Sequence, residues 1–303
     1  MSLTDFERYL RLEMNRSRHT VEAYLRDVSQ YCAWTDSTPE ALLSDHAVEP
    51  NDIRDWIGTL AMQGEKPASL RRKTQSLRAF FRWGMTIGLC HANPAADVVL
   101  AKLPRHLPDT AKVSEIEEII ATHPTDTIHD LRVLMALKML YTLGLRQAEL
   151  LSVTDSDIRQ GAGGAEIRIT GKGNKERILP LPPQLAEDIR QWQRERDRHY
   201  DALPEPKPLL AARHGALSKG TLYTDIHNVL AGTSAARKSP HILRHSCATA
   251  LLNNGANIDA VRQLLGHASL ATTQIYTHLS PRELRQAYNH AHPRASSKPD
   301  SED

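Results

Sequence analysis

The sequence predicts a mainly helical protein in two parts, an N-terminal helical bundle and a C-terminal mixed α+β domain with a small β-hairpin. Three observations support this fold class. Apolar residues recur at helical spacing over most of residues 1–98. Two prolines within Leu103–Pro108 then interrupt any helix. Residues 165–180 change to the alternating pattern of paired strands.

These breaks predict the domain boundaries. We expect an N-terminal domain over residues 1–98, a linker over 99–108 and a second domain over 109–292. The remaining residues, 293–303, are polar, and this composition predicts a disordered tail.

Composition narrows the class of protein. A chain of 303 residues is long enough for two hydrophobic cores. Its net charge is only +2, so any nucleic-acid binding must come from local basic patches. Three scattered cysteines indicate neither a disulfide framework nor a zinc cluster, and they fit a reducing compartment. Without a signal peptide or membrane-length apolar run, we expect a cytoplasmic protein with no membrane partner.

The N-terminal part contains one conspicuously basic helix, predicted over Pro67–Trp83. This segment has five arginines and lysines and no acidic residue. Its apolar stripe is Leu70, Leu77 and Phe81. A neighbouring stripe, about a quarter turn away, is Arg71, Arg78 and Arg82. An ordinary solvated face is one interpretation; the absence of acids favours contact with nucleic-acid phosphates.

The C-terminal part begins with predicted helices and the hairpin. Ser114 and Glu117 match a capping box at a helix start. A long apolar helix is predicted from Asp130 to Leu143, and Gly144 ends it. The hairpin turns at Gly171-Lys172-Gly173-Asn174, so Lys172 lies at its tip.

Residues 239–280 concentrate the candidate chemistry. Ser239 and Pro240 predict a helix start, and His241 and Arg244 share a face of that helix because they are three residues apart. Gly255 ends it, Asn257 caps the next helix, and Gly266-His267 closes that one. A short helix from Ser269 ends near Tyr276, and a last helix spans residues 281–290.

Metal and nucleotide sites do not fit these residues. His241 and His245 are spaced as in a zinc protease, but the glutamate that should follow His241 is Ile242. The Gly171-Lys172 turn lacks the spacing of a nucleotide-binding P-loop. Singly, the other candidates have plain explanations, such as an Arg146–Glu149 pair on a helix surface or a half-buried Tyr276.

Together these residue types match attack on a phosphodiester. Two arginines suit the charge that develops on the phosphate oxygens. Histidines donate hydrogen bonds and move protons, a tyrosine surrounded by cations becomes a nucleophile, and a lysine protonates the leaving oxygen. The cations supply the electrostatic stabilisation, so the reaction calls for no metal.

Five motifs in one order resemble the tyrosine recombinases, and within them the Xer type. The motifs are Gly144–Leu150, Gly171–Arg177, His241–His245, Leu264–His267 and Thr272–His278. The resemblance covers nearly the whole chain. It implies a SAM-like core-binding domain at the N-terminus, a tyrosine recombinase catalytic domain at the C-terminus, and no cofactor.

The resemblance also implies roles for individual residues. Tyr276 is the nucleophile that forms a 3′-phosphotyrosyl link, and Lys172 is the general acid. The remaining expected catalytic residues are Arg146, Arg244, His241 and His267, which bind the scissile phosphate. Glu149 is expected to support them. The segment Cys247–Ala250 departs from the family pattern, and we expect altered packing there without lost activity.

The implied partners are double-stranded DNA with a short pseudo-palindromic site, a sister recombinase in a heterotetrameric synapse, and a DNA translocase of the division septum. The implied activity is the resolution of chromosome dimers before cell division. Two alternatives stay open at the level of sequence. One is a mobile-element or phage integrase with the same chemistry, and the other is an architectural DNA-binding protein without catalysis.

Overall fold

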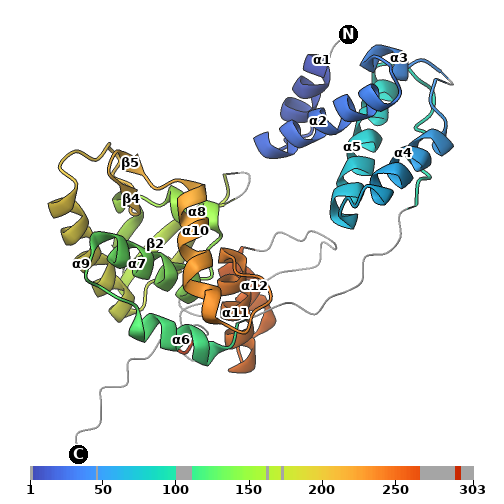
Figure 1. The fold of residues 1–303 in the computed structure, drawn as a ribbon. Coiled ribbons are helices and arrows are strands. Elements are labelled where there is room, and N and C mark those ends of the chain that lie inside the picture. The colour runs from blue at the N-terminus through green and yellow to red at the C-terminus, as the bar shows by residue number, and fades with distance from the viewer. Residues whose placement is uncertain are drawn as a thin grey trace, which may run out of the picture. The chain divides into compact units, whose positions relative to one another are not determined.

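The computed structural model describes residues 3–45, 47–99, 111–161, 164–171, 174–266 and 291–294. The chain divides into two compact units, residues 1–105 and 106–303, which are described separately below (Figure 1). Most of the expected linker lies outside the described residues. Also outside them are Lys172, His267, Tyr276 and the two helices predicted from Ser269 onwards.

Unit 1 is entirely helical within its described residues. Its elements are α1 (Leu3–Arg8), a π-helical turn η1 (Tyr9–Glu13), α2 (Arg18–Trp34), α3 (Pro39–Leu42), α4 (Pro50–Met62) and α5 (Pro67–Thr86). The long helices α2 and α5 pack against each other, and α4 packs on α5. The predicted apolar stripe of α5 is confirmed, since Leu70, Leu77 and Phe81 are all buried.

Unit 2 contains seven α-helices among its described residues. They are α6 (Val113–Thr122), α7 (Ile128–Thr142), α8 (Gln147–Ser152), α9 (Pro183–His199), α10 (Lys219–Val229), α11 (Pro240–Asn253) and α12 (Ile258–Leu265). Two 3₁₀ turns are also present, Asp155–Asp157 after α8 and Leu230–Gly232 directly after α10. Helix α7 is central because α9, α10 and α11 all pack against it. Its near-continuous apolar sequence is explained by this burial on several sides.

The main sheet of unit 2 has three antiparallel strands in the order β1 (Ile158–Gly161), β2 (Gly164–Thr170) and β3 (Glu176–Pro180). Ile167 lies opposite both Ile158 and Leu179, so one face packs on the helices. The predicted hairpin β2–β3 is confirmed. Strand β1 was not predicted because its four residues include only one apolar side chain. A second, two-stranded ribbon joins β4 (Ala211–Ala212) to β5 (Gly215–Ala216).

Two helix starts and one helix cap differ from the sequence prediction. Helix α6 begins at Val113, and the carboxylate of Glu115, not of Glu117, accepts a hydrogen bond from the backbone N–H of the capping residue Lys112. Helix α7 begins earlier than predicted, because Thr127 and Asp130 form a reciprocal capping box. Ser239 does precede α11, but its hydroxyl makes no capping hydrogen bond.

The end of α12 forms as predicted. The side chain of Asn257 caps its start by accepting a hydrogen bond from the Asp259 N–H at 2.8 Å. Gly266 ends the helix in the left-handed conformation, with φ of 65°, which favours glycine. Helix α12 therefore ends in a defined backbone conformation directly before His267.

The structure describes the first two residues of the expected disordered tail, 293 and 294. Residues 293 and 294 form a turn, and the guanidinium of Arg294 pairs with Glu117 on α6 at 2.7 Å. The preceding Ala291 and His292 are buried, and the backbone carbonyl of Ala291 accepts a hydrogen bond from the side chain of Asn254. Contacts with α6 and with the end of α11 thus hold this short segment on its own unit.

Candidate active site

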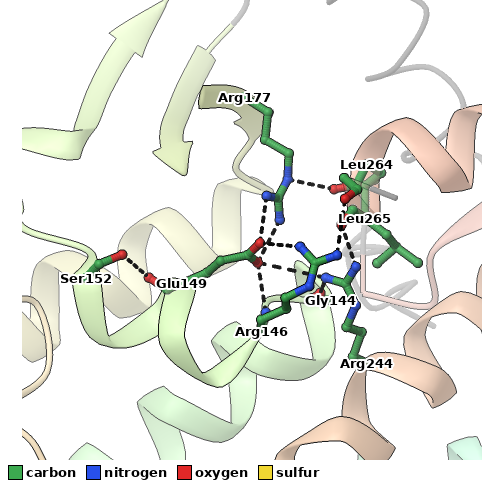
Figure 2. A network of polar contacts seen from close by, with 9 residues as sticks. Gly144, Arg146, Glu149, Ser152, Arg177, Arg244, Leu264 and Leu265 are labelled. Atoms are coloured by element: carbon green, nitrogen blue, oxygen red, sulfur yellow. Dashed lines mark hydrogen bonds and ion pairs between the residues drawn. The ribbon is translucent and has the colours of Figure 1, made fainter. Parts of the chain in front are cut away.

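The candidate active site is built around one buried carboxylate. Glu149, in the first turn of α8, is only 3% exposed. Three arginines from separate parts of the sequence approach it: Arg146 directly before α8, Arg177 on β3 and Arg244 on α11 (Figure 2). A buried carboxylate is stable only when it is paired and hydrogen-bonded, and these arginines meet that requirement.

Arg146 is held at both its backbone and its side chain. Its backbone N–H donates to Glu149 Oε2 at 2.8 Å, and its Nη1 donates to Glu149 Oε1 at 2.6 Å. Its Nη2 donates to the backbone carbonyl of Gly266 at 3.1 Å. About a third of this side chain remains exposed to solvent. Arg146 is therefore oriented by the protein and still accessible to an anion.

Arg244 joins the same cluster from the other side. Its Nη1 donates to the carbonyl of Gly144 at 2.6 Å and lies 3.8 Å from Glu149 Oε2, while its Nη2 donates to the carbonyl of Leu265. Leu265 is the last residue of α12, where carbonyl groups lack partners within the helix, and Gly144 lies two residues after the end of α7. Arg244 thus ties three helices of unit 2 together at one point.

Arg177 is the residue that sequence reasoning missed. It lies within one of the motifs, but the motif assigned it no role. In the structure its Nη1 and Nη2 each donate to one oxygen of Glu149, at 3.0 and 2.9 Å, and its Nε donates to the carbonyl of Leu264 (Figure 2). Its partners lie 28 and 87 residues away in the sequence, so no local pattern signals these contacts.

The electrostatics of the cluster favour an anion. Burial would raise the pKa of the Glu149 carboxyl, but the hydrogen bonds from Arg177 and Arg146 outweigh it and hold that pKa below its ordinary value. Burial, together with repulsion from Arg146, lowers the pKa of Arg244 to about 10, so it stays cationic at neutral pH. Three guanidinium groups sharing one ionised carboxylate carry excess positive charge.

His241 lies on the same helix as Arg244, three residues before it, as the sequence predicted. Partial loss of hydration and repulsion from His245, Arg244 and Arg146 lower the pKa of His241 below its ordinary value. We therefore expect a neutral imidazole at physiological pH, which can both donate and accept a hydrogen bond.

Two family models match this chain. Residues 110–283 match the phage integrase family, and residues 3–87 match the phage integrase N-terminal SAM-like domain. The tyrosine recombinase XerC of Corynebacterium efficiens is 34% identical over 97% of this chain and 92% of its own length.

The chain belongs to the phage integrase family of tyrosine recombinases. A second relative, the tyrosine recombinase XerD of Lacticaseibacillus casei, is 32% identical over 96% of this chain and 98% of its own length. Among solved structures, the XerH site-specific recombinase bound to its difH substrate has the same fold. Its TM-score is 0.65 at 22% identity, and it covers 94% of this chain and 82% of that one. Membership makes the chain a site-specific DNA recombinase.

The segment where this recombinase departs from the family pattern is part of the core. Cys247 is fully buried, and burial raises the pKa of its thiol to about 12. Its Sγ would lie 3.2 Å from a Cβ built on Gly144, whose φ is 58°. Cys247 therefore packs beneath the start of the Gly144–Leu150 motif and is an inert core residue.

The basic stripe of α5 divides into two kinds of arginine. Arg71 and Arg82 are exposed, whereas Arg78 donates hydrogen bonds to the carbonyls of Ala95, Ala96 and Val98 at 2.8 to 3.1 Å. Arg78 therefore holds residues 95–98 against α5. Apolar periodicity did not predict this structural role. A groove beside Arg71 and Arg78, also lined by Gln75 and Val99, has a volume of about 440 Å³.

Two further findings concern metals and membranes. Within the described ranges, no three histidine, cysteine, aspartate or glutamate side chains gather in a way that would hold a metal ion. None of the helices in that part of the chain combines the length and apolarity needed to span a bilayer.

Proposed function

We propose that this recombinase cuts and rejoins DNA through a 3′-phosphotyrosyl intermediate on Tyr276, as a member of the Xer type. The observation that carries the proposal is the convergence of Arg146 and Arg244 on the Glu149 carboxylate, with His241 close enough to both arginines that their charge lowers its pKa. Bidentate guanidinium groups match the geometry of a phosphate, and their positions are set before the substrate arrives.

The proposed chemistry is one transesterification and its reverse. The Tyr276 hydroxyl gives its proton to a histidine, His241 or His267, and its oxygen forms a bond to phosphorus. The bond from phosphorus to the 5′ oxygen breaks, and Lys172 gives that oxygen a proton. Arg146 and Arg244 stabilise the negative charge of the transition state, and His241 and His267 hydrogen-bond the phosphate. The phosphotyrosyl bond keeps the energy of the original phosphodiester, so rejoining needs no cofactor.

We further propose that the substrate is a short dif-like chromosomal site in the cytoplasm, acted on with a sister recombinase of the XerD type before cell division. Similarity over almost the whole chain to proteins named XerC and XerD supports this assignment. Residues 104–108 and 291–295 resemble the XerC branch, while overall identity to the two branches is nearly equal. A DNA translocase of the septum is a further proposed partner. Full-length similarity to Xer recombinases favours this function over that of a phage integrase.

In the proposed synapse, residues 281–290 of one protomer dock on the next. Truncation after Ser280 is a poor test of this docking, because it would also delete Ala291 and His292, which are buried on their own unit. Substitution of Leu284 and Tyr288 by alanine is therefore the cleaner variant, with cooperative binding beside the partner recombinase as the measurement.

The nucleophile is tested by trapping the covalent adduct. A recombination-site duplex with a nick beside the scissile phosphate releases its short fragment after cleavage, so the phosphotyrosyl adduct accumulates. We expect Tyr276→Phe to keep DNA affinity and to form no adduct, because the attacking oxygen is gone. Tyr223→Phe is the matched control, since Tyr223 is exposed on α10 and should react normally. An adduct formed by Tyr276→Phe would overturn the assignment, because another residue would then be the nucleophile.

A further inference from the structure

We propose that Arg177 is a positioning residue. Together with Glu149 it fixes two segments of backbone: the end of the hairpin strand directly before Lys172, and the end of α12 directly before His267. The inference rests on the proposed roles of Lys172 and His267. Arg177 itself does not touch the reacting atoms in this scheme. It acts through the backbone to which the reacting side chains are attached.

Every guanidinium nitrogen of Arg177 has a hydrogen-bond partner. Two nitrogens bind the two oxygens of Glu149, and the third binds the carbonyl of Leu264 near the end of α12. The side chain is mostly buried, at 15% exposure. A guanidinium used in this way is a spacer of fixed geometry, unlike Arg146, which is more open to solvent.

Two glycines lie close to this guanidinium. A Cβ built on Gly171 would lie 3.6 Å from Glu149 Oε1 and 3.7 Å from Arg177 Nη1. A Cβ built on Gly266 would lie 3.1 Å from Arg177 Nη1 and 3.3 Å from its Cζ. The backbone therefore passes near the Arg177–Glu149 pair at both places, and at Gly266 a side chain would displace the guanidinium.

Two of the proposed catalytic side chains come immediately after these glycines. Lys172 adjoins Gly171, and His267 adjoins Gly266. Glu149 also accepts the backbone N–H of Arg146, the arginine proposed to clamp the phosphate. A single guanidinium–carboxylate pair thus adjoins the backbone next to three proposed catalytic side chains.

The physical consequence is specific to arginine. A lysine at position 177 would keep the positive charge beside Glu149, but its single ammonium cannot hold both carboxylate oxygens and the Leu264 carbonyl in one plane. A displacement of about 1 Å in a positioned group costs roughly 100-fold in rate. Loss of the fork should therefore slow proton delivery by Lys172 while leaving the protein folded.

The test compares Arg177→Lys on two substrates. One is ordinary recombination-site DNA, and the other carries a 5′-bridging phosphorothiolate, whose leaving group needs little protonation. We expect Arg177→Lys to slow cleavage of ordinary DNA by about 10- to 100-fold. The phosphorothiolate should recover the part of this loss that is due to proton delivery by Lys172, while the part due to His267 remains on both substrates. A general weakening of the fold would slow both substrates equally, and that result would overturn the positioning role.

Two controls separate the possible failures. Arg168→Lys removes a similar fork from the neighbouring strand, where Arg168 Nε and Nη2 bind Asp157 at 3.0 and 2.8 Å, and it should show no substrate-dependent defect. Lys172→Ala tests the general acid itself. If the phosphorothiolate does not rescue Lys172→Ala, the proposed role of Lys172 is wrong. If it rescues Lys172→Ala but not Arg177→Lys, only the positioning role is overturned.

A second variant keeps the proposal testable if Arg177→Lys unfolds. Gly266→Ala pushes on the same guanidinium from α12, and its matched control is Gly255→Ala. Gly255 also has a positive φ, 85°, but a Cβ there meets nothing within 4 Å. We expect similar backbone strain in both variants and a phosphorothiolate-rescued defect only in Gly266→Ala. Equal cleavage by the two alanine variants would overturn the inference.

Discussion

Each unit of this recombinase contains a buried carboxylate surrounded by cations, yet the two clusters differ in construction. In unit 1, Asp27 on α2 is fully buried and bonds to Arg72 and Ser76, with Lys73 at 3.9 Å. All three partners lie on one helix, α5. In unit 2, the partners of Glu149 come from the start of α8, from β3 and from α11.

The balance of charge also differs. Lys73 lies 3.6 Å from a second carboxylate, that of Glu65, so two cations in unit 1 meet two anions. In unit 2 three arginines share Glu149, and Arg146 stays partly exposed. A balanced cluster between two packed helices stabilises the fold, whereas a cluster with excess cations is arranged for an incoming anion.

The largest expected effect comes from removing the charge of each of the two buried carboxylates. We predict that Glu149→Gln lowers the cleavage rate by about 100-fold and destabilises unit 2 by roughly 3 kcal/mol, because buried arginines lose their counter-charge. Asp27→Asn should cost unit 1 a similar free energy of unfolding, with cleavage unchanged below its melting temperature. Single-turnover cleavage and thermal melting of both variants check this. Equal loss of cleavage in the two variants would remove the distinction.

The dependence of stability on pH should also distinguish the two units, because unit 2 contains the buried histidine His292. Burial lowers the pKa of His292 to about 4, and its Nδ1 accepts the N–H of Arg294. The unfolded chain, with an ordinary pKa near 6.5, then binds a proton that the native state excludes. Stability of unit 2 should therefore fall as the pH drops from about 6.5 to 4, by up to ~3 kcal/mol. Among the described residues of unit 1, no histidine is buried.

The corresponding measurement is denaturant unfolding of the wild type and His292→Gln across this pH range. We expect the variant to lose most of the pH dependence between 6.5 and 4 while retaining the acid transition of the carboxylates. An unchanged slope in His292→Gln would show that the burial of His292 does not govern the acid response.

The smallest effect concerns the basic stripe of α5, where the structure separates engaged from exposed arginines. Arg71→Ala with Arg82→Ala should reduce the salt slope of DNA binding by up to ~2, about 0.9 for each phosphate that the protein no longer neutralises. Arg78→Ala should instead lower the melting temperature of unit 1, because three carbonyl groups lose their donor. A salt slope unaffected by the double variant would return Arg71 and Arg82 to an ordinary solvated face.

Short stretches of sequence determine much of the local structure. Apolar spacing located α5 and α7, since each must bury apolar side chains. The turn at Gly171–Asn174 predicted the hairpin, and Asn257 and Gly266 predicted both ends of α12. The motifs also identified Arg146, Arg244 and His241 as candidates, because their residue types and order match attack on a phosphodiester.

Tertiary structure alone decided which charged side chains from distant segments meet. Arg72 and Lys73 belong to a segment without acidic residues, yet they serve Asp27, 45 residues from Arg72. Arg177 was one letter in a motif, and only the tertiary structure brings its side chain on β3 to Glu149 on α8 and to the Leu264 carbonyl on α12. The physical reason is that periodicity reports which face of an element is buried, whereas ion pairs between distant elements depend on how those faces pack together.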